Sequence, residues 1–342
     1  MKFEILAITL LAASVGAVPL RTDEANDWQL ISDVNGRMHI VDLTATDMEA
    51  EPLFNAYNDV VFRLFTRSNP TTPEAQIIRI NNNEQLANSF FNVNHPTRFH
   101  VHGWNGGGQN TGASIRNAFL NRGDNFNVFT VDWGIGATTP NYILARNRVN
   151  DAGNIVAQFI DFLNAYGLSF NLIGLIGHSL GAQVAGAAGK RTSRGIVASI
   201  VGLDPAGPLF SLDDPANRLH HTDAQYVECH VTDGGRLGFQ HPVGHANFYP
   251  NWGIQQPGCG PDLTGQCGHS LATTFMVESI NPANIFGASR CRDLEDIRAR
   301  QCVISGPSRR LGGEPVQDGP AIVGSVYFLA TNAASPFAQG PR

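Results

Sequence analysis

The stretch 171–190, NLIGLIGHSLGAQVAGAAGK, decides the fold of this 342-residue chain. It begins with an apolar run, turns at GHSLG (177–181) and continues in small residues. A buried strand, a sharp turn and a closely packed helix have this pattern, and the turn matches G-x-S-x-G, which presents a serine hydroxyl above a sheet. A side chain at either glycine would collide with a neighbouring strand or helix. The stretch predicts an elbow that exposes Ser179; the alternative is a glycine-rich turn with a solvated serine.

Strand-like and helix-like segments alternate on both sides of this stretch. The predicted strands are 60–66, 77–80, 98–102, 127–133 and 196–202, and the predicted helices are 112–121 and 142–163. Alternation from about 98 to 204 implies right-handed crossovers and a mostly parallel central sheet flanked by helices, in an α/β fold with a single catalytic domain. Such sheets bind ligands at the carboxyl ends of their strands, where Ser179 and Asp204 both fall.

The amino-acid composition excludes some classes of function for this chain. The length suits one large α/β domain, and 42% hydrophobic residues allow a sizeable core. The net charge is -6 and the sequence has no Lys/Arg run, so we expect neither nucleic-acid binding nor a basic membrane-surface patch.

The N-terminus has the features of a secretory signal. Lys2 precedes an apolar run, and Val15-Gly16-Ala17 supplies small residues for cleavage after Ala17. We therefore expect a signal peptide at 1–17 and a secreted, extracellular protein. The polar segment 18–52 is predicted to be an N-terminal extension, either a removable pro-segment or an arm packed on the body, and 53–342 is the predicted catalytic domain.

Five cysteines suit an oxidising compartment, where four would pair and one would remain. Local pairing is the simplest scheme and gives Cys259–Cys267 and Cys291–Cys302. Cys229 lies in a predicted strand and is predicted to be a buried free thiol. The cysteine spacings do not suggest zinc, and no metal site is expected.

A serine hydroxyl needs a base to remove its proton, and the base is usually a histidine oriented by a carboxylate. With a G-x-S-x-G serine the chain order is Ser, then Asp or Glu, then His. Asp204 ends the strand after the elbow and is the best acid. His269, which lies just before the predicted helix 271–280, is modestly favoured as the base. Its rivals are His220, His221, His230, His241 and His245.

An oxyanion hole needs two backbone N–H groups aimed at the reacting carbonyl oxygen. One is expected from Leu180, which follows the serine. The other is expected from Trp104, because Gly103 lets the chain turn sharply after the strand 98–102. The Trp104 side chain is expected to line the acyl pocket.

Several motifs together resemble the pancreatic lipase family. They are HGW (102–104), GHSLGA (177–182), GLDPAGP (202–208), VGH (243–245), FYPN (248–251) and CGHS (267–270), in the family's order. The resemblance covers about 58–339. It implies an α/β-hydrolase fold, hydrolysis of ester bonds in acylglycerols and phospholipids, and no cofactor. It also implies Ser179 as nucleophile, Asp204 as acid and His269 as base, and it agrees with the cysteine pairing.

Three departures from the family bear on function. The chain stops where larger members begin a C-terminal β-sandwich, so we expect no partner binding through that domain. The loop 260–266, at the place of the family's lid, is short, as in phospholipase A1 and arthropod members. In the segment that corresponds to the family's calcium site, about 215–223, Asp223 matches a ligand but His220 stands where another would be.

Two function classes follow. The first is a secreted lipid carboxylester hydrolase acting on lipid at an oil–water or membrane surface, either a triacylglycerol lipase or a phospholipase A1. The second is a non-catalytic, yolk-type lipid-binding or storage protein on the same scaffold. Insect yolk proteins lack the serine, so Ser179 favours the enzyme.

Overall fold

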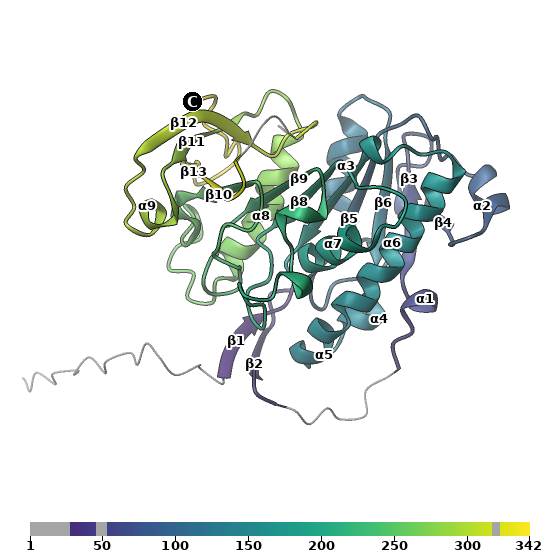
Figure 1. Cartoon of the computed structure of the whole chain (residues 1–342), viewed down its shortest axis with the longest axis horizontal. Coiled ribbons are helices and arrows are strands. Elements are labelled where there is room, and N and C mark those ends of the chain that lie inside the picture. The colour runs from purple at the N-terminus through teal and green to yellow at the C-terminus, as the bar shows by residue number, and fades with distance from the viewer. Residues whose placement is uncertain (1–27, 46–52, 317–321) are drawn as a thin grey trace, which may run out of the picture.

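The computed structural model describes residues 28–45, 53–316 and 322–342. The predicted signal peptide 1–17 lies outside these residues, as do parts of the segment 18–52. Within the described residues, eleven strands form one sheet in the order β12-β11-β13-β10-β9-β8-β7-β5-β6-β3-β4 (Figure 1). The strands are β3 (Val61–Phe65), β4 (Gln76–Ile78), β5 (Thr97–Val101), β6 (Asn127–Asp132), β7 (Ile173–His178), β8 (Ser199–Leu203), β9 (Tyr226–His230), β10 (Ala246–Pro250), β11 (Phe286–Cys291), β12 (Ile304–Leu311) and β13 (Ser325–Leu329).

Helices cover both faces of this sheet. The α-helices are α1 (Ala56–Asp59), α2 (Asn83–Ala87), α3 (Ala113–Asn121), α4 (Gly134–Ala137), α5 (Tyr142–Asn147), α6 (Val149–Tyr166), α7 (Leu180–Arg191), α8 (Gln266–Ser279) and α9 (Leu294–Arg298). On one face α6 packs against α7, and α7 lies on β7, β8 and β5. On the other face α3 packs against α8, which lies on β8. The layers place the loops of both faces around the ends of the central strands.

The seven strands β13, β10, β9, β8, β7, β5 and β6 run parallel to one another, and the strands at the two edges pair antiparallel. The central strand β7 is buried along its whole length between β5 and β8. Ser179 follows its carboxyl end, and Asp204 follows the carboxyl end of β8. This arrangement confirms the expected α/β-hydrolase fold.

The core between α6 and the sheet is rich in phenylalanine. The Phe62 and Phe159 rings stack with centroids 3.8 Å apart, and Phe129 meets the Phe159 ring edge-on at 5.2 Å. All three side chains are at least 98% buried. Burying such rings contributes roughly 1.5–3 kcal/mol each, which fixes α6 against the sheet.

Two predicted helices have different bounds in the structure. The segment 142–163 was expected as one helix, but it forms α5 and α6, which meet at Arg148. Arg148 is buried, donates to the Gly136 carbonyl and lies over the Phe54 ring, so tertiary contacts bend the chain where the apolar spacing alone continues. The helix expected at 271–280 begins earlier, at Gln266.

Residues 28–45 fold into a two-stranded antiparallel hairpin of β1 (Trp28–Ser32) and β2 (Met38–Asp42). Ile31 and Val41 are buried and belong to the main hydrophobic core. The hairpin therefore packs on the body of the domain. Figure 1 shows it as a separate purple ribbon beside the large sheet. In the part of the chain that the structure describes, we find no helix that is both long and apolar enough to span a membrane.

Candidate active site

The elbow at Ser179 is a closely packed turn between β7 and α7. Ser179 has φ 57° and ψ -125°, a strained conformation for a residue with a side chain. A Cβ at Gly177 would lie 2.2 Å from the Gly181 carbonyl oxygen, and one at Gly181 would lie 2.2 Å from the Val101 carbonyl oxygen. Both contacts are with backbone, so the elbow has room only for glycine at these two positions. This geometry excludes the alternative of a loose, solvated turn, because Ser179 is only 8% exposed.

Asp204 and His269 meet beside the elbow. Asp204 Oδ2 is 2.6 Å from His269 Nδ1, and both side chains are buried. The other oxygen, Oδ1, accepts hydrogen bonds from the N–H groups of Thr232 at 2.8 Å and Asp233 at 3.0 Å. A carboxylate held by these three donors fixes the imidazole in one orientation and one tautomer, with the proton on Nδ1. Nε2 is then left for another partner.

His269 lies in the first turn of α8 rather than in a loop before the helix. The structure separates it from its rivals. His230 contacts Glu228 at 2.5 Å, and His245 Nδ1 accepts the Val227 N–H. His220 and His221 lie together in a short 3-10 segment, and His241 packs against a phenylalanine. Among the described residues, His269 is the histidine that contacts Asp204.

A second histidine, His178, contacts His269 next to the elbow. Its Nε2–H donates to the His269 carbonyl at 3.0 Å, and the two ring centroids are 4.5 Å apart. Burial holds the pKa of His178 well below the ordinary histidine value, so the ring is neutral at neutral pH. The sequence analysis missed this contact, since it treated His178 only as a variable position of the G-x-S-x-G pattern.

The two expected oxyanion donors keep their N–H groups free. Neither the Trp104 nor the Leu180 N–H donates to another described group. The Trp104 side chain differs from expectation. It is only 1% exposed, its Nε1–H donates to the Thr139 carbonyl at 2.8 Å, and it packs edge-on against Tyr142. The indole is thus a core group that anchors the loop, and the prediction that it lines an open acyl pocket is wrong.

The hairpin of β1 and β2 holds the Trp104 loop from the outside. The Val34 N–H donates to the Trp104 carbonyl at 3.1 Å, and Asn35 Nδ2 donates to the Asn105 carbonyl at 3.0 Å. The Val34 side chain also lies 3.3 Å from the position of a Cβ built on Gly103. The hairpin therefore fixes the chain directly after the Trp104 N–H, which is one of the two expected oxyanion donors.

Asp33 organises the hairpin turn. Its Oδ1 accepts the N–H groups of Asn35 and Arg37, and its Oδ2 accepts from Asn105 Nδ2 at 3.0 Å and lies 3.1 Å from His39 Nε2. The sequence analysis missed this role. The signal was the Asn35-Gly36 pair between two alternating apolar runs, which is typical of a hairpin turn.

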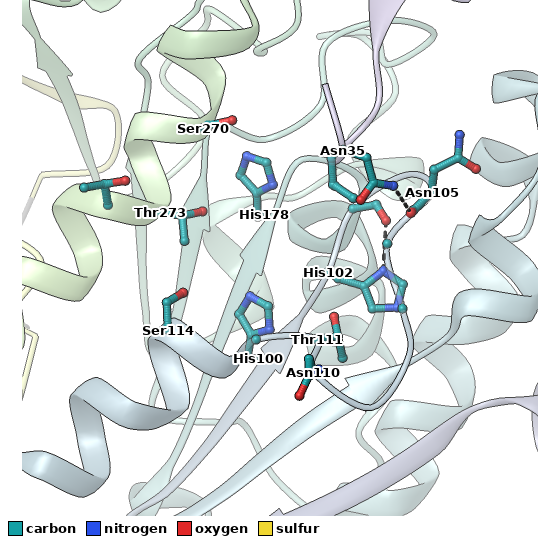
Figure 2. Close-up of a pocket in the computed structure, with 16 residues that line it drawn as sticks. Asn35, His100, His102, Asn105, Asn110, Thr111, Ser114, His178, Ser270 and Thr273 are labelled. Carbon is teal, nitrogen blue, oxygen red and sulfur yellow. Dashed lines mark hydrogen bonds between the residues drawn. The ribbon is translucent and has the colours of Figure 1, made fainter. Parts of the chain in front are cut away.

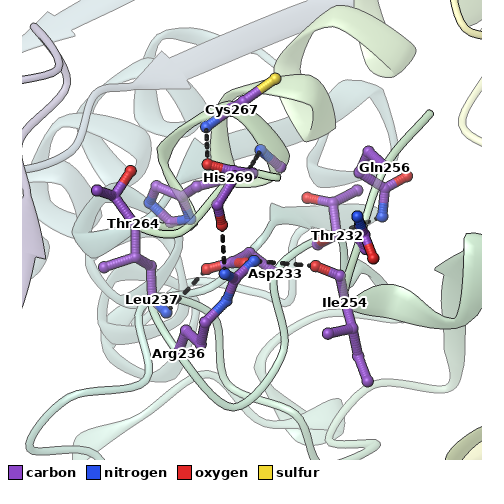
Figure 3. Close-up of polar contacts among 12 residues, drawn as sticks. Thr232, Asp233, Arg236, Leu237, Ile254, Gln256, Thr264, Cys267 and His269 are labelled. Atoms are coloured by element: carbon purple, nitrogen blue, oxygen red, sulfur yellow. Dashed lines mark hydrogen bonds and ion pairs between the residues drawn. The ribbon is translucent and has the colours of Figure 1, made fainter. Parts of the chain in front are cut away.

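The disulfide loop between Cys259 and Cys267 lies against the start of α8. Cys259–Cys267 and Cys291–Cys302 are the disulfides of the described residues, and Cys229 is a buried free thiol. Figure 3 shows Arg236 in contact with Asp233 and with the Ile254 carbonyl. Its guanidinium contacts the buried Asp233 carboxylate and donates to the Asp262 and Ile254 carbonyls. Asp262 in turn accepts the N–H of Gly268, next to His269. The loop is thereby tied to the start of α8.

The segment that resembles a calcium site does not fit a calcium ion. Asp223 is fully buried, and its carboxylate contacts Lys190 Nζ at 2.5 Å and the His220 N–H at 2.8 Å. The Lys190 ammonium already provides a positive charge where a cation would bind. Calcium also prefers a cage of several oxygen ligands, which a lysine and a histidine do not supply.

Comparisons with known proteins agree with this geometry. The family model described as Lipase matches residues 31–337. "Lipase member H" of Xenopus tropicalis is 35% identical over 250 residues, covering 70% of this chain and 52% of that protein. "Lipase member H" of Oryctolagus cuniculus is 36% identical over 255 residues, covering 71% and 54%. "Pancreatic triacylglycerol lipase" of Homo sapiens is 31% identical over 307 residues, covering 81% and 64%. The chain thus spans about half to two thirds of the length of these relatives.

Proposed function

The chain belongs to the lipase family, and from this membership we propose that it is a serine carboxylester hydrolase that cleaves fatty-acyl esters of acylglycerols or phospholipids through an acyl-enzyme intermediate. The single observation that carries the proposal is the contact between Asp204 and His269 beside the elbow that presents Ser179. A charge-assisted contact of 2.6 Å between buried groups, next to a strained serine, suits nucleophilic catalysis.

In the proposed mechanism Ser179 Oγ attacks the ester carbonyl carbon. His269 Nε2 takes the hydroxyl proton, because Asp204 holds the proton on Nδ1. The carbonyl oxygen becomes an oxyanion, which the N–H groups of Trp104 and Leu180 stabilise. When the intermediate collapses, His269 returns the proton to the leaving alcohol, and the fatty acid remains esterified to Ser179.

Deacylation repeats these steps with water as the nucleophile. His269 takes a proton from water, the hydroxide attacks the acyl carbon, and the fatty acid leaves as Ser179 recovers its proton. The backbone donors serve both half-reactions without rearranging, since the hairpin and the α7 N-terminus hold them in place.

The alternative function, a non-catalytic lipid-binding protein, is less well supported. A storage protein has no need for a strained serine at the elbow or a carboxylate with three donors. Strain of this kind costs about 1–3 kcal/mol and persists where function uses it. We therefore favour the enzyme.

Substrate preference is the finer part of the proposal. The short loop 260–266 between Cys259 and Cys267 leaves the site open, which favours weak interfacial activation and room for a polar group next to the ester. We propose action on lipid at an oil–water or membrane surface, with both triacylglycerol and phospholipid hydrolysis as candidates. The predicted signal peptide and the two disulfides support secretion.

The test is a substrate panel with the wild-type chain and Ser179→Ala. Fatty-acid release is measured from triolein emulsions, phosphatidylcholine vesicles and a soluble short-chain ester. We expect the wild type to release fatty acid from the soluble ester and from at least one lipid. In Ser179→Ala we expect kcat to fall roughly 10⁴–10⁶-fold and the circular dichroism spectrum to stay the same. Lipid binding by both proteins without hydrolysis by either would instead support the storage protein.

A further inference from the structure

A cavity of about 450 Å³ lies next to the proposed reaction centre, on the α3 and α8 side of the sheet. Figure 2 shows it between the hairpin turn at Asn35, the loop after β5, and the first turns of α8. Gly103 and His178, which directly precede Trp104 and Ser179 in the chain, both line it. A group attached to the reacting ester therefore reaches this cavity within a few bonds.

The walls carry no ionised side chain. The lining residues include no Lys, Arg, Asp or Glu, and no Phe, Tyr or Trp. Three imidazoles face the cavity from β5 and the elbow: His100, His102 and His178. Burial lowers the pKa of His100 to about 3 and that of His178 well below its ordinary value.

His102 makes a hydrogen bond through each of its ring nitrogens. Its Nδ1–H donates to the Gly103 carbonyl at 2.9 Å, and its Nε2 accepts the Trp133 N–H at 3.1 Å. His100 and His178 thus present uncharged rings to the cavity.

Several polar groups of the wall lack partners within the structure. In the described residues, no hydrogen bond joins the hydroxyls of Thr111, Ser114, Thr273 or Thr274 to another group. His100 is 94% buried, since only 6% of it is exposed, and its Nδ1 also has no partner among the described residues. Ser114 is exposed and the three threonines are half-buried, so His100 Nδ1 is the buried atom of this group that has no partner. Buried polar groups are normally hydrogen-bonded, so this nitrogen suits a ligand that brings a hydroxyl to it.

We propose that this cavity binds an uncharged, hydroxyl-bearing group next to the scissile ester, such as the free hydroxyls of a partial glyceride or of a sugar headgroup. The proposal rests on the proposed function, because it names the substrate class of that same site. Hydroxyls donate to imidazole nitrogens and accept from threonine and serine hydroxyls, so they match every free group of the wall.

The same walls disfavour a phosphocholine headgroup. The wall includes no arginine or lysine to pair with a phosphate, although the N-terminus of α3 lies in it at Gly112 and Ser114. A quaternary ammonium is bound by aromatic faces, which the wall also lacks. A phosphocholine group in this cavity would therefore lose its hydration and gain neither a side chain of opposite charge nor an aromatic face.

The first experiment compares oleoyl esters in one neutral detergent micelle. The substrates are methyl oleate, monoolein, a dioleoyl galactosylglycerol and dioleoyl phosphatidylcholine. We expect kcat/KM for monoolein or the galactolipid to exceed that for phosphatidylcholine by roughly tenfold or more, and the two hydroxylated substrates distinguish glycerol from sugar. Equal or faster phosphatidylcholine cleavage overturns the proposal. Failure to cleave methyl oleate contradicts the proposed function instead.

The second experiment changes the wall. Thr273→Val removes one free hydroxyl and keeps its shape, so we expect the loss of kcat/KM on the hydroxylated substrates to exceed the loss on methyl oleate roughly 5–30-fold. Ser114→Lys adds a cation to the cavity and is expected to raise the ratio of phosphatidylcholine to monoolein hydrolysis at least fivefold. Asn121→Lys, at the other end of α3 and outside the cavity, is its matched control. Identical changes on all substrates, or the same shift with the control, overturn the proposal.

Discussion

The elbow at Ser179 and the cavity beside it occupy the same rim of the sheet but are built in opposite ways. The elbow is closed: a Cβ added to either of its glycines would lie 2.2 Å from a backbone carbonyl oxygen, so nothing larger fits. The cavity is open: four hydroxyls and one imidazole nitrogen on its wall have no partner in the described structure. Under the proposed function, catalysis and substrate choice are therefore specified separately. Tight packing fixes the position of the proposed nucleophile, and the polar groups of the cavity wall are proposed to select what is bound next to it.

The largest expected effect comes from the acid behind the elbow. In Asp204→Asn the side-chain amide replaces the oxygen that accepts from His269 Nδ1, so the wrong tautomer is favoured. We expect kcat on a soluble ester to fall roughly 10⁴-fold with little change in unfolding free energy. Asp124→Asn, on an exposed aspartate, is the control and should leave kcat unchanged. An Asp204→Asn enzyme within tenfold of wild type would contradict the proposed role.

The closed character of the elbow is tested by Gly181→Ala. The new methyl group meets the Val101 and His102 carbonyl oxygens, neither of which can move without shifting β5. We expect the free energy of unfolding to fall by about 3 kcal/mol or more in urea denaturation. Gly123→Ala places the same methyl group in open space at a positive φ and should cost about 1 kcal/mol. Equal losses in the two variants would mean that the elbow has room to adjust.

The hairpin turn joins the two regions, because it holds the Trp104 loop and lines the cavity. Asp33→Ala removes the acceptor of two turn N–H groups and of Asn105 Nδ2. We expect kcat on a soluble ester to fall about 10–100-fold, through a misplaced oxyanion donor, with KM changed less. Ile40→Ala, on a 75% exposed residue of the same hairpin, serves as the control. Unchanged kcat in Asp33→Ala would show that the hairpin covers the domain without positioning the site.

The smallest effect concerns the far end of the elbow helix, where Lys190 contacts Asp223. Burial raises the pKa of Asp223 to about 6, whereas an unfolded aspartate titrates at about 4. Between these values the folded chain keeps a proton that the unfolded chain has released, so stability falls as the pH rises through this window.

Replacing this carboxyl with an amide removes that dependence. As the pH rises from 4 to 6, the unfolding free energy of Asp223→Asn should fall by about 1–2 kcal/mol less than that of the wild type. Urea unfolding at several pH values measures the difference. Parallel curves for the two proteins would mean that Asp223 titrates normally in the fold.

The sequence was sufficient to predict the fold and the elbow. The elbow lies in one continuous stretch of sequence. Its glycines are required by contacts that any β-turn-α unit of this kind makes, so the residues next to Ser179 are enough to predict the turn. Asp204 was also predictable, because it ends the next parallel strand. His269 was not selected with certainty by residue order alone, since spatial proximity to Asp204 decides among six histidines.

The cavity and the hairpin were not predictable in the same way. The cavity wall draws on the hairpin turn, β5 and its loop, α3, the elbow and α8, which are far apart in the chain. No local pattern marks a threonine of α8 as a neighbour of His100. The Asn35-Gly36 turn was visible in the sequence, yet its docking on Trp104 depends on Asp33 and Asn105, 72 positions apart.

The most direct test of the central claim is covalent trapping of the nucleophile. The wild-type chain is incubated with a long-chain fluorophosphonate, digested and mapped by mass spectrometry. Formation of one phosphonyl adduct on Ser179, its absence in Ser179→Ala and its strong slowing in Asp204→Asn are the predicted results. An adduct on another serine, or no adduct on a correctly folded wild-type chain, would contradict the account.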